Sequence, residues 1–258
     1  MIWIVQCVLA ALIWFFGASV FSFLNVVIYR VPRQISFVRG YSHCPDCGHR
    51  LSGLDMVPVF SWLFLRGRCR YCGGKVSSRY MWMELFGGCI ALLCVFKIGY
   101  NLAAITVFAF LGMLTVVALV DIDTMEIPNG FVLTILVIGL VSVVTVPGIS
   151  LTQRLIGLVS VSLPLLLITL IIPGAFGGGD IKLMGACGLL LGWKMNLISL
   201  FLAVLTGGFY GMYLLGTRRK GRKEHFAFGP FLCVGMFISL FWGQSLLERY
   251  LKLCGLGL

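Results

Sequence analysis

The chain has 258 residues, of which 60% are hydrophobic and 11% are charged. An ordinary water-soluble domain carries roughly 25% charged residues, so this composition excludes that class of protein. The 20 Lys and Arg outnumber the 9 Asp and Glu and give a net charge of +11. Together these numbers predict a membrane protein with several spans, whose basic residues lie between the apolar stretches.

Eight apolar stretches are candidates for membrane spans, because roughly 20 apolar residues in a helix cross a hydrocarbon core of about 30 Å. The first, residues 1–29, is predicted to be an anchor with its N-terminus outside, since no Lys or Arg precedes it. The others are expected at residues 80–96, 98–120, 127–153, 155–179, 183–193, 195–217 and 226–247. The predicted fold class is therefore an all-α polytopic membrane protein with about eight transmembrane helices.

Placing the N-terminus outside assigns four connecting segments to the cytosol, namely residues 30–79, 121–126, 174–182 and 218–225. These segments hold 15 of the 20 basic residues, as the positive-inside rule requires. Membrane lipid is an expected partner, because the cluster at residues 218–223 should contact anionic headgroups at the cytosolic face. Nucleic acid is the less favoured interpretation of the same cluster.

Residues 30–79 form the one substantial polar segment and carry two C-x-x-C-G motifs. Two thiolates from each turn can close a four-sulfur cage around a tetrahedral metal, and the following Gly permits the turn. A structural zinc ion is the preferred interpretation, because some 50 residues bury little core without a metal. Two disulfides or redox pairs are the alternative, which a reducing cytosol disfavours. The expected ligands are Cys44, Cys47, Cys69 and Cys72.

The acidic residues of the apolar part are functional candidates, because an ionisable group near hydrocarbon is costly unless it faces a polar cavity. Asp121 directly follows an apolar run, and Asp180 ends a triple-glycine segment; both belong to expected cytosolic ends. The stretch 183–193 is too short to cross the bilayer, so the glycine segment should dip inward and bring Asp180 near Asp121. A tight helix contact is the alternative explanation of the glycines.

Two facing carboxyls that share a proton can hydrolyse a peptide bond, one as base and the other as acid. Asp121 is expected at a helix C-terminus and Asp180 at an N-terminus, so the helix dipoles favour Asp180 as the anion and therefore as the base. Asp123 and Glu126 are expected to be solvated and to attract a basic substrate segment. A proton- or cation-coupled transporter or channel using Asp121 and Asp180 is the alternative function.

These motifs resemble the type IV prepilin leader peptidase/N-methyltransferase family, a branch of the GxGD intramembrane aspartic peptidases. The resemblance is carried by six features in the family order: Phe23–Pro32, the two cysteine motifs, Val57–Trp62 with Arg66–Cys69, Arg79-Tyr80 with Glu84-Leu85, Asp121 followed by Ile127-Pro128-Asn129, and Gly177-x-Gly179-Asp180-x-Lys182.

The resemblance implies an enzyme of the bacterial cytoplasmic (inner) membrane, with its active site on the cytosolic side. It would remove the short basic leader of type IV prepilins and pseudopilins. Asp121 and Asp180 would be the catalytic pair, and Gly177, Gly179 and Lys182 would belong to the loop that contacts the substrate. It also implies N-methylation of the new N-terminus with S-adenosylmethionine, a reaction for which Glu84 is the candidate residue. A buried acid paired with Arg79 or Lys75 is the alternative role of Glu84.

The expected domains follow from these assignments. Residues 1–29 form the first transmembrane helix, residues 30–79 the cytosolic zinc module, and residues 80–258 a seven-helix peptidase domain.

Overall fold

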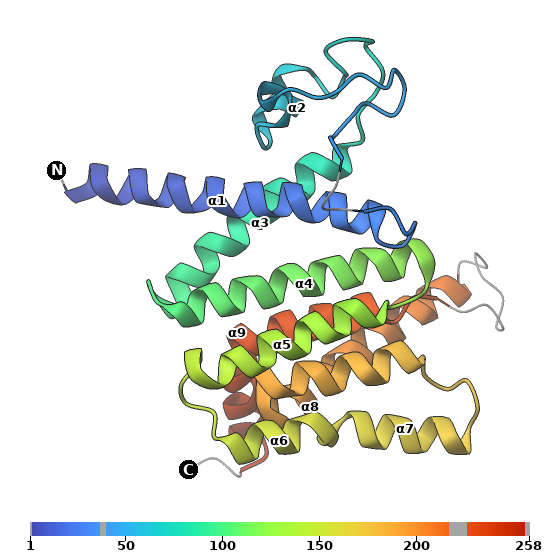
Figure 1. Cartoon of the computed structure of the whole chain (residues 1–258). Coiled ribbons are helices and arrows are strands. Elements are labelled where there is room, and N and C mark those ends of the chain that lie inside the picture. The colour runs from blue at the N-terminus through green and yellow to red at the C-terminus, as the bar shows by residue number, and fades with distance from the viewer. Residues whose placement is uncertain (1, 37–39, 217–225, 256–258) are drawn as a thin grey trace. The chain divides into compact units, whose positions relative to one another are not determined.

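The fold was analysed in a computed structural model of the whole chain (Figure 1), which describes residues 2–36, 40–216 and 226–255. The basic cluster at residues 218–223 lies outside the described residues. All regular structure in the described part is helical, apart from two isolated β-bridges. The elements are α1 (Ile2–Arg30), the 3-10 helix η1 (Gly53–Met56), α2 (Phe60–Phe64), α3 (Ser78–Ile98), α4 (Leu102–Thr124), α5 (Asn129–Thr145), α6 (Leu151–Ser160), α7 (Ser162–Ile171), α8 (Gly178–Gly216) and α9 (Gly229–Leu253).

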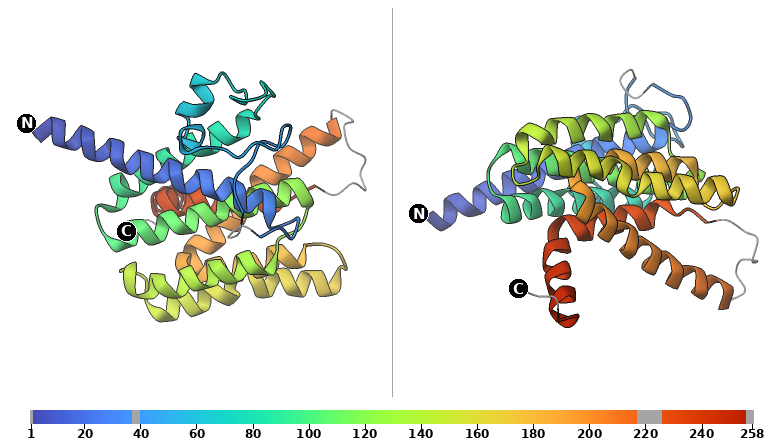
Figure 2. Two further views of the ribbon diagram at one scale, coloured as in Figure 1. Left: turned by 45° about the horizontal axis from the view of Figure 1, so that its top comes forward. Right: turned by 90° about the horizontal axis from the view of Figure 1, so that it is seen from below.

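The helices confirm the predicted all-α membrane fold. Six spans within the described residues are long and apolar enough to cross a bilayer, and α5 is a shorter apolar helix. Helix α8 contains a break at Gly192, where φ is 70° and ψ is 169°, so it comprises two helical segments. Figure 2 shows that these two segments point in different directions. Counting α6 with α7 as one pass and α8 as two, the described chain has the eight helical passes that were predicted.

Two span boundaries differ from the prediction. Helix α5 ends at Thr145, and the next span begins at Leu151 and ends at Ile171, eight residues before the expected boundary at 179. Apolar composition continues through residues 172–177 without a helix, so hydropathy alone placed the end too late. Arg154, expected between spans, lies inside α6 instead.

The chain divides into two compact units, Met1–Phe108 and Ala109–Leu258. In the first unit α1 packs against α3 through glycines. A Cβ on Gly17 would lie 2.5 Å from the carbonyl oxygen of Gly87, and one on Gly88 would lie 2.5 Å from the Trp14 ring. Small residues of this kind allow close approach of membrane helices, where packing rather than the hydrophobic effect holds helices together.

In the second unit the first segment of α8 is packed against α5 and α6. The contact with α6 is a glycine contact as well, because a Cβ on Gly188 would lie 2.0 Å from the carbonyl oxygen of Gly157. Asn196 donates to the carbonyl of Gly157 at 3.0 Å and to that of Met184 at 3.1 Å, and so links α8 to α6 beside this contact. The start of α8, which carries Asp180, is therefore held on a closely packed helix.

Arg154 joins the far ends of these helices. Its side chain is 1% exposed, and its guanidinium donates five hydrogen bonds. The acceptors are Ser142 Oγ and the carbonyls of Ser142, Val146, Ile149 and Leu189. The last carbonyls of a helix have no partner within the helix, and a cation is favoured there by the dipole. One arginine thus supplies hydrogen bonds to the carbonyls at the C-terminal ends of α5 and of the first segment of α8.

Candidate active site and metal cluster

Asp121 lies in the last turn of α4 and is 5% exposed. The helix ends three residues later at Thr124, and Met125 then adopts a positive φ of 55° and donates its N–H to the carbonyl of Asp121 at 2.8 Å. The Asp121 carboxylate accepts the backbone N–H of Gly229 at 2.9 Å. Gly229 is the first residue of α9, so this acid uses one of the N–H groups that a helix start leaves without an internal partner.

Asp180 lies in the first turn of α8 and is 9% exposed. The residue before the helix, Gly177, accepts the N–H of Ile181 at 3.3 Å and donates its own N–H to the Asp180 carboxylate. An acid three residues into a helix that accepts the N–H of the residue before the helix forms one half of a capping box. Asp180 therefore has a fixed position at a helix N-terminus, as the sequence predicted.

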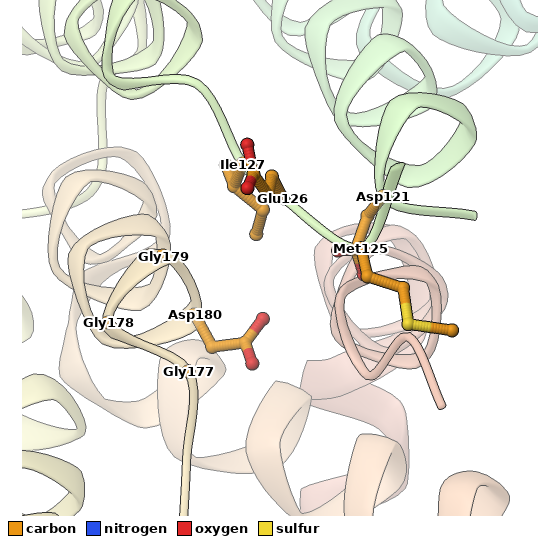
Figure 3. Close-up of a pocket in the computed structure, with 8 residues that line it drawn as sticks. All are labelled: Asp121, Met125, Glu126, Ile127, Gly177, Gly178, Gly179 and Asp180. Carbon is orange, nitrogen blue, oxygen red and sulfur yellow. The ribbon is translucent and has the colours of Figure 1, made fainter. Parts of the chain in front are cut away.

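The two acids line one cavity of about 290 Å³, together with Met125, Glu126, Ile127 and the glycines 177–179. In Figure 3 the Asp180 side chain projects from the start of α8 into this space, towards the end of α4 that carries Asp121. Two residues 59 positions apart in sequence thus meet at one end of the second unit, and the cavity between them can hold water and a peptide.

The glycine segment fits closely against the loop after α4. A Cβ on Gly179 would lie 2.9 Å from the Cβ of Ile127, and one on Gly177 would lie 3.1 Å from an oxygen of Asp180. Lys182 donates to Asn129 Oδ1 at 3.1 Å and ties the start of α8 to the start of α5. Gly177 and Gly179 line the cavity, whereas Lys182 braces the helices beside it.

The environment of Asp121 includes a feature that the sequence did not predict. Its own helix, α4, presents a C-terminal end, which disfavours an anion, but α9 directs its N-terminal end at the same carboxylate. Gly229 carried no signal in the sequence, because its role depends on where α9 begins in space. The choice of Asp180 as base and Asp121 as acid stays a prediction.

Asp123 and Glu126 are exposed, as expected, and Glu126 lies at the rim of the cavity. Glu126 gives the cavity entrance a negative charge and is not one of the two paired carboxyls.

The four cysteines of the first unit form a compact cluster. The sulfur atoms of Cys44, Cys47, Cys69 and Cys72 all lie within 4.8 Å of one another, and those of Cys44 and Cys72 are 3.9 Å apart. Zinc–sulfur bonds of about 2.3 Å in a tetrahedron separate the sulfurs by about 3.8 Å, so the cluster fits a four-thiolate metal site. A disulfide would need a sulfur separation of about 2.05 Å, and all four are free thiols.

The two cysteine turns are built alike. Gly48 and Gly73 follow the second cysteine of each pair with φ of 69° and 72°, a conformation that favours glycine, and each donates its N–H to the first cysteine's carbonyl. Asp55 binds the second turn through Arg70 Nε at 2.7 Å and Tyr71 at 3.1 Å. Hydrogen bonds from Ser52 first, and then from Arg70 and Tyr71, hold the pKa of the Asp55 carboxyl well below its usual range.

Glu84 is buried in α3 and does not pair with Lys75 among the described contacts. Its carboxylate accepts the Val59 N–H at 2.6 Å and a hydrogen bond from the Ser22 side chain. Val59 has a positive φ of 65° and precedes α2, so Glu84 caps the start of that short helix. Asn25, one turn after Ser22 on α1, is also buried, and its Nδ2 has no hydrogen-bond partner.

The fold and the site define a multi-pass membrane protein with a pair of buried carboxylates in one cavity. Residues 15–98 match the bacterial peptidase A24 N-terminal domain, and residues 108–212 match the type IV leader peptidase family. The prepilin leader peptidase/N-methyltransferase of Bacillus subtilis (strain 168) is 30% identical over 243 residues, which cover 94% of this chain and 98% of that protein. The protein of the same name from Aeromonas hydrophila is 31% identical over 270 residues, covering 93% of each chain.

The chain therefore belongs to the type IV leader peptidase family, as its motifs indicated. No solved structure matches it significantly.

Proposed function

We propose that this protein is a bifunctional membrane enzyme that cleaves the leader from type IV prepilins and pseudopilins and methylates the new N-terminus. Its family and the names of its relatives support both activities. The observation that carries the peptidase function is the shared cavity of Asp121 and Asp180, two buried acids supplied by the ends of different helices.

The proposed hydrolysis uses one acid in each protonation state. The ionised carboxylate takes a proton from a water molecule while the water oxygen attacks the scissile carbonyl carbon. The protonated carboxyl gives its proton to the carbonyl oxygen, which forms a neutral diol. The diol then collapses as the second carboxylate takes a proton back from one of its hydroxyls, the C–N bond breaks, and the amine leaves with the proton that the first carboxyl had taken. Two like charges in one cavity cannot both ionise readily, so the pair retains the single proton that this cycle needs.

We assign the role of base to Asp180, which lies at the N-terminus of its own helix and is capped by Gly177. Asp121 would then carry the proton on the oxygen that does not accept the Gly229 N–H. Because the two acids are coupled, the pair rather than either residue would titrate in a pH profile of cleavage.

The substrate would lie extended across the glycine segment. Backbone without side chains at Gly177 and Gly179 allows a peptide to approach the two acids closely. Glu126 at the rim, with Asp123 nearby, would attract the basic leader. The positive-inside distribution of Lys and Arg supports placing this cavity at the cytosolic face of the bacterial inner membrane.

Methyl transfer would use S-adenosylmethionine, which supplies an electrophilic methyl group on a sulfonium. Two buried residues of the first unit fit this sulfonium compound. Glu84 is an acid that would face its positive charge, and Asn25 has an amide N–H donor without a hydrogen-bond partner. Their role in this chain is to bind and orient the donor and the new amine. Zinc is the proposed occupant of the four-cysteine cluster, because four thiolates without an open position suit a structural zinc ion.

The transporter alternative has no support in the comparisons. It also requires acids spaced through the depth of the membrane, whereas Asp121, Glu126 and Asp180 line a single cavity at one end of the second unit.

Purified protein in detergent, incubated with a prepilin-like peptide, tests the peptidase function. Asp121→Asn and Asp180→Asn should each lower the cleavage rate at least about a thousandfold, because each removes one half of the acid–base pair. Asp123→Asn is the matched control and should lower it only modestly. Cleavage that survives both changes would overturn the assignment, and abolition by the control would mean that a different acid reacts. Labelled S-adenosylmethionine in the same reaction reports methyl transfer to the product.

A further inference from the structure

A second cavity, of about 320 Å³, lies in the first unit and has no part in the site described above. It is lined by Trp62, Arg66, Gly67, Arg68, Lys75, Val76 and Ser78. Its wall is preformed: Trp62 Nε1 donates to the Val76 carbonyl at 3.2 Å, and Gly67 lies so near the Trp62 ring that a Cβ there would be 2.7 Å from it. The backbone of Arg66 has a positive φ of 52°. Non-glycine residues rarely adopt this conformation unless the surrounding structure holds them in it.

The cavity is strongly positive. Three of its lining residues are cations, and none of its lining residues is acidic. Of the acids near these residues in the described part of the chain, Asp55 forms an ion pair of 2.7 Å with Arg70, Glu84 accepts the Val59 N–H, and Asp46 lies beside Gly74 in the second cysteine turn. Three cations around one cavity that no acidic residue lines favour an anionic ligand.

An apolar surface adjoins the cations. On α2, which also carries Trp62, the Leu63 side chain is 52% exposed and the Phe64 side chain 82% exposed. On the same helix Phe60 stacks on Phe15 of the membrane-spanning helix α1, with ring centroids 5.6 Å apart. Ser78 of the cavity is the first residue of the membrane-spanning helix α3. The exposed apolar residues thus adjoin helices that are long and apolar enough to cross a membrane.

We propose that this surface, formed by Leu63, Phe64, Arg66, Arg68 and Lys75 and called the α2 corner, binds an anionic phospholipid. The three cations bind the headgroup phosphate, and Leu63 and Phe64 insert beside the acyl chains. Apolar residues next to Lys and Arg, with Trp at the boundary, are the combination that holds a segment in the membrane interface. The α2 corner therefore attaches the cysteine cluster to the leaflet independently of the basic residues 218–223.

The charge of the cavity argues against the methyl donor as its ligand. S-adenosylmethionine carries a sulfonium and an ammonium against one carboxylate, so a cavity with three cations would repel it. A basic prepilin leader would be repelled for the same reason.

Lipid retention tests the proposal. The protein is placed in nanodiscs that contain equal amounts of phosphatidylglycerol and phosphatidylcholine. Native mass spectrometry then counts the lipids that stay bound to the protein when it is released from the nanodisc. Wild type should retain phosphatidylglycerol at least tenfold over phosphatidylcholine. The triple variant Arg66→Gln, Arg68→Gln, Lys75→Gln should retain at least fivefold less phosphatidylglycerol than wild type, since each basic residue near an anionic surface contributes about fivefold in binding. Leu63→Asn with Phe64→Asn should reduce retention with all charges intact.

A charge-matched control removes three exposed cations elsewhere, Lys194, Arg249 and Lys252, each to Gln, and should bind lipid like wild type. The bound metal in the same spectra shows whether each variant keeps its cysteine cluster. Equal retention by the triple variant and wild type would overturn the proposal, as would displacement of the lipid by millimolar inorganic phosphate, which would identify a free-anion site. Because lipid retention is measured without substrate, the result is independent of the proposed peptidase function.

Discussion

Gly178 and Gly179 are neighbours in sequence, but a side chain would meet different surroundings at each. A Cβ on Gly178 has nothing within 4 Å, whereas one on Gly179 would lie 2.9 Å from the Cβ of Ile127. Both lie in the first turn of α8, beside Asp180.

Gly179→Ala should therefore displace the start of α8 from the loop after α4 and slow peptide cleavage at least tenfold, since small errors in the position of a reacting group are costly. Gly178→Ala is the matched control and should stay within about twofold of wild type. Cleavage rates in detergent with the same peptide measure both. Equal rates for the two variants would show that the close contact at Gly179 has no part in positioning Asp180.

Arg154 is the second residue whose importance depends on its surroundings. Arg154→Met would remove the charge and leave the carbonyls at two helix ends without hydrogen-bond partners. Each buried carbonyl left without a partner costs roughly 1–3 kcal/mol of stability. The free energy of unfolding should fall by about 3 kcal/mol or more, visible as a lower melting temperature in detergent. Arg154→Lys should recover only part of the lost free energy of unfolding, because an ammonium cannot reproduce the planar set of N–H donors of the guanidinium. The exposed Arg249→Met should change stability by less than about 0.5 kcal/mol.

At the scale of elements, the first segment of α8 decides where Asp180 lies. This segment ends at Gly192 and is shorter than a bilayer crossing, so packing against α5 and α6 has to fix its depth. The glycine contact between Gly157 and Gly188 sets how closely α6 approaches it.

Gly188→Ala should push α6 and α8 apart, because the added methyl would meet the Gly157 backbone at 2.0 Å rather than a flexible side chain. We expect a destabilisation of about 1–3 kcal/mol, together with slower cleavage. Gly208→Ala, in the second segment of α8, adds the same methyl with nothing within 4 Å and should be tolerated. Thermal unfolding of both variants in one detergent gives the comparison, and a stable Gly188→Ala protein would show that the helices can separate without cost.

At the scale of the whole molecule, the two chemical features belong to different units. The four cysteines and Glu84 lie in Met1–Phe108, and both acids of the cavity lie in Ala109–Leu258. The family matches follow the same division: residues 15–98 lie in the first unit, and residues 108–212 lie in the second apart from Phe108.

Metal removal should therefore affect the two activities unequally. A chelator, or Cys44→Ser, should release the bound metal and loosen the two cysteine turns from each other, since the four thiolates around one ion would join them. Methyl transfer should fall at least tenfold, whereas peptide cleavage should retain a measurable fraction of its rate. Metal content, limited proteolysis between residues 40 and 78, and the two activities in one preparation measure this. Cys254→Ser, which removes an exposed cysteine outside the cluster, is the control.

Composition and motif spacing were enough to predict the helical membrane fold, the number of passes, the four-cysteine cluster and the two acids of the cavity. These features depend on local chemistry: an apolar run has to form a helix in lipid, and two C-x-x-C-G turns have the geometry of a metal site whatever surrounds them. That the short stretch 183–193 makes the glycine segment dip into the membrane stays a prediction, whereas the lining of one cavity by Asp121 and Asp180 is observed.

Only the tertiary structure decided the partners of Asp121, Glu84 and Arg154. Gly229 reaches Asp121 from 108 residues away, Val59 reaches Glu84 from 25, and Arg154 binds carbonyls of two other helices. Each of these three residues has backbone N–H or C=O groups among its partners, and almost every residue type carries the same backbone groups, so no sequence pattern distinguishes the ones used. Which of them are free, and which side chain meets them, depends on where helices end and how they pack in three dimensions.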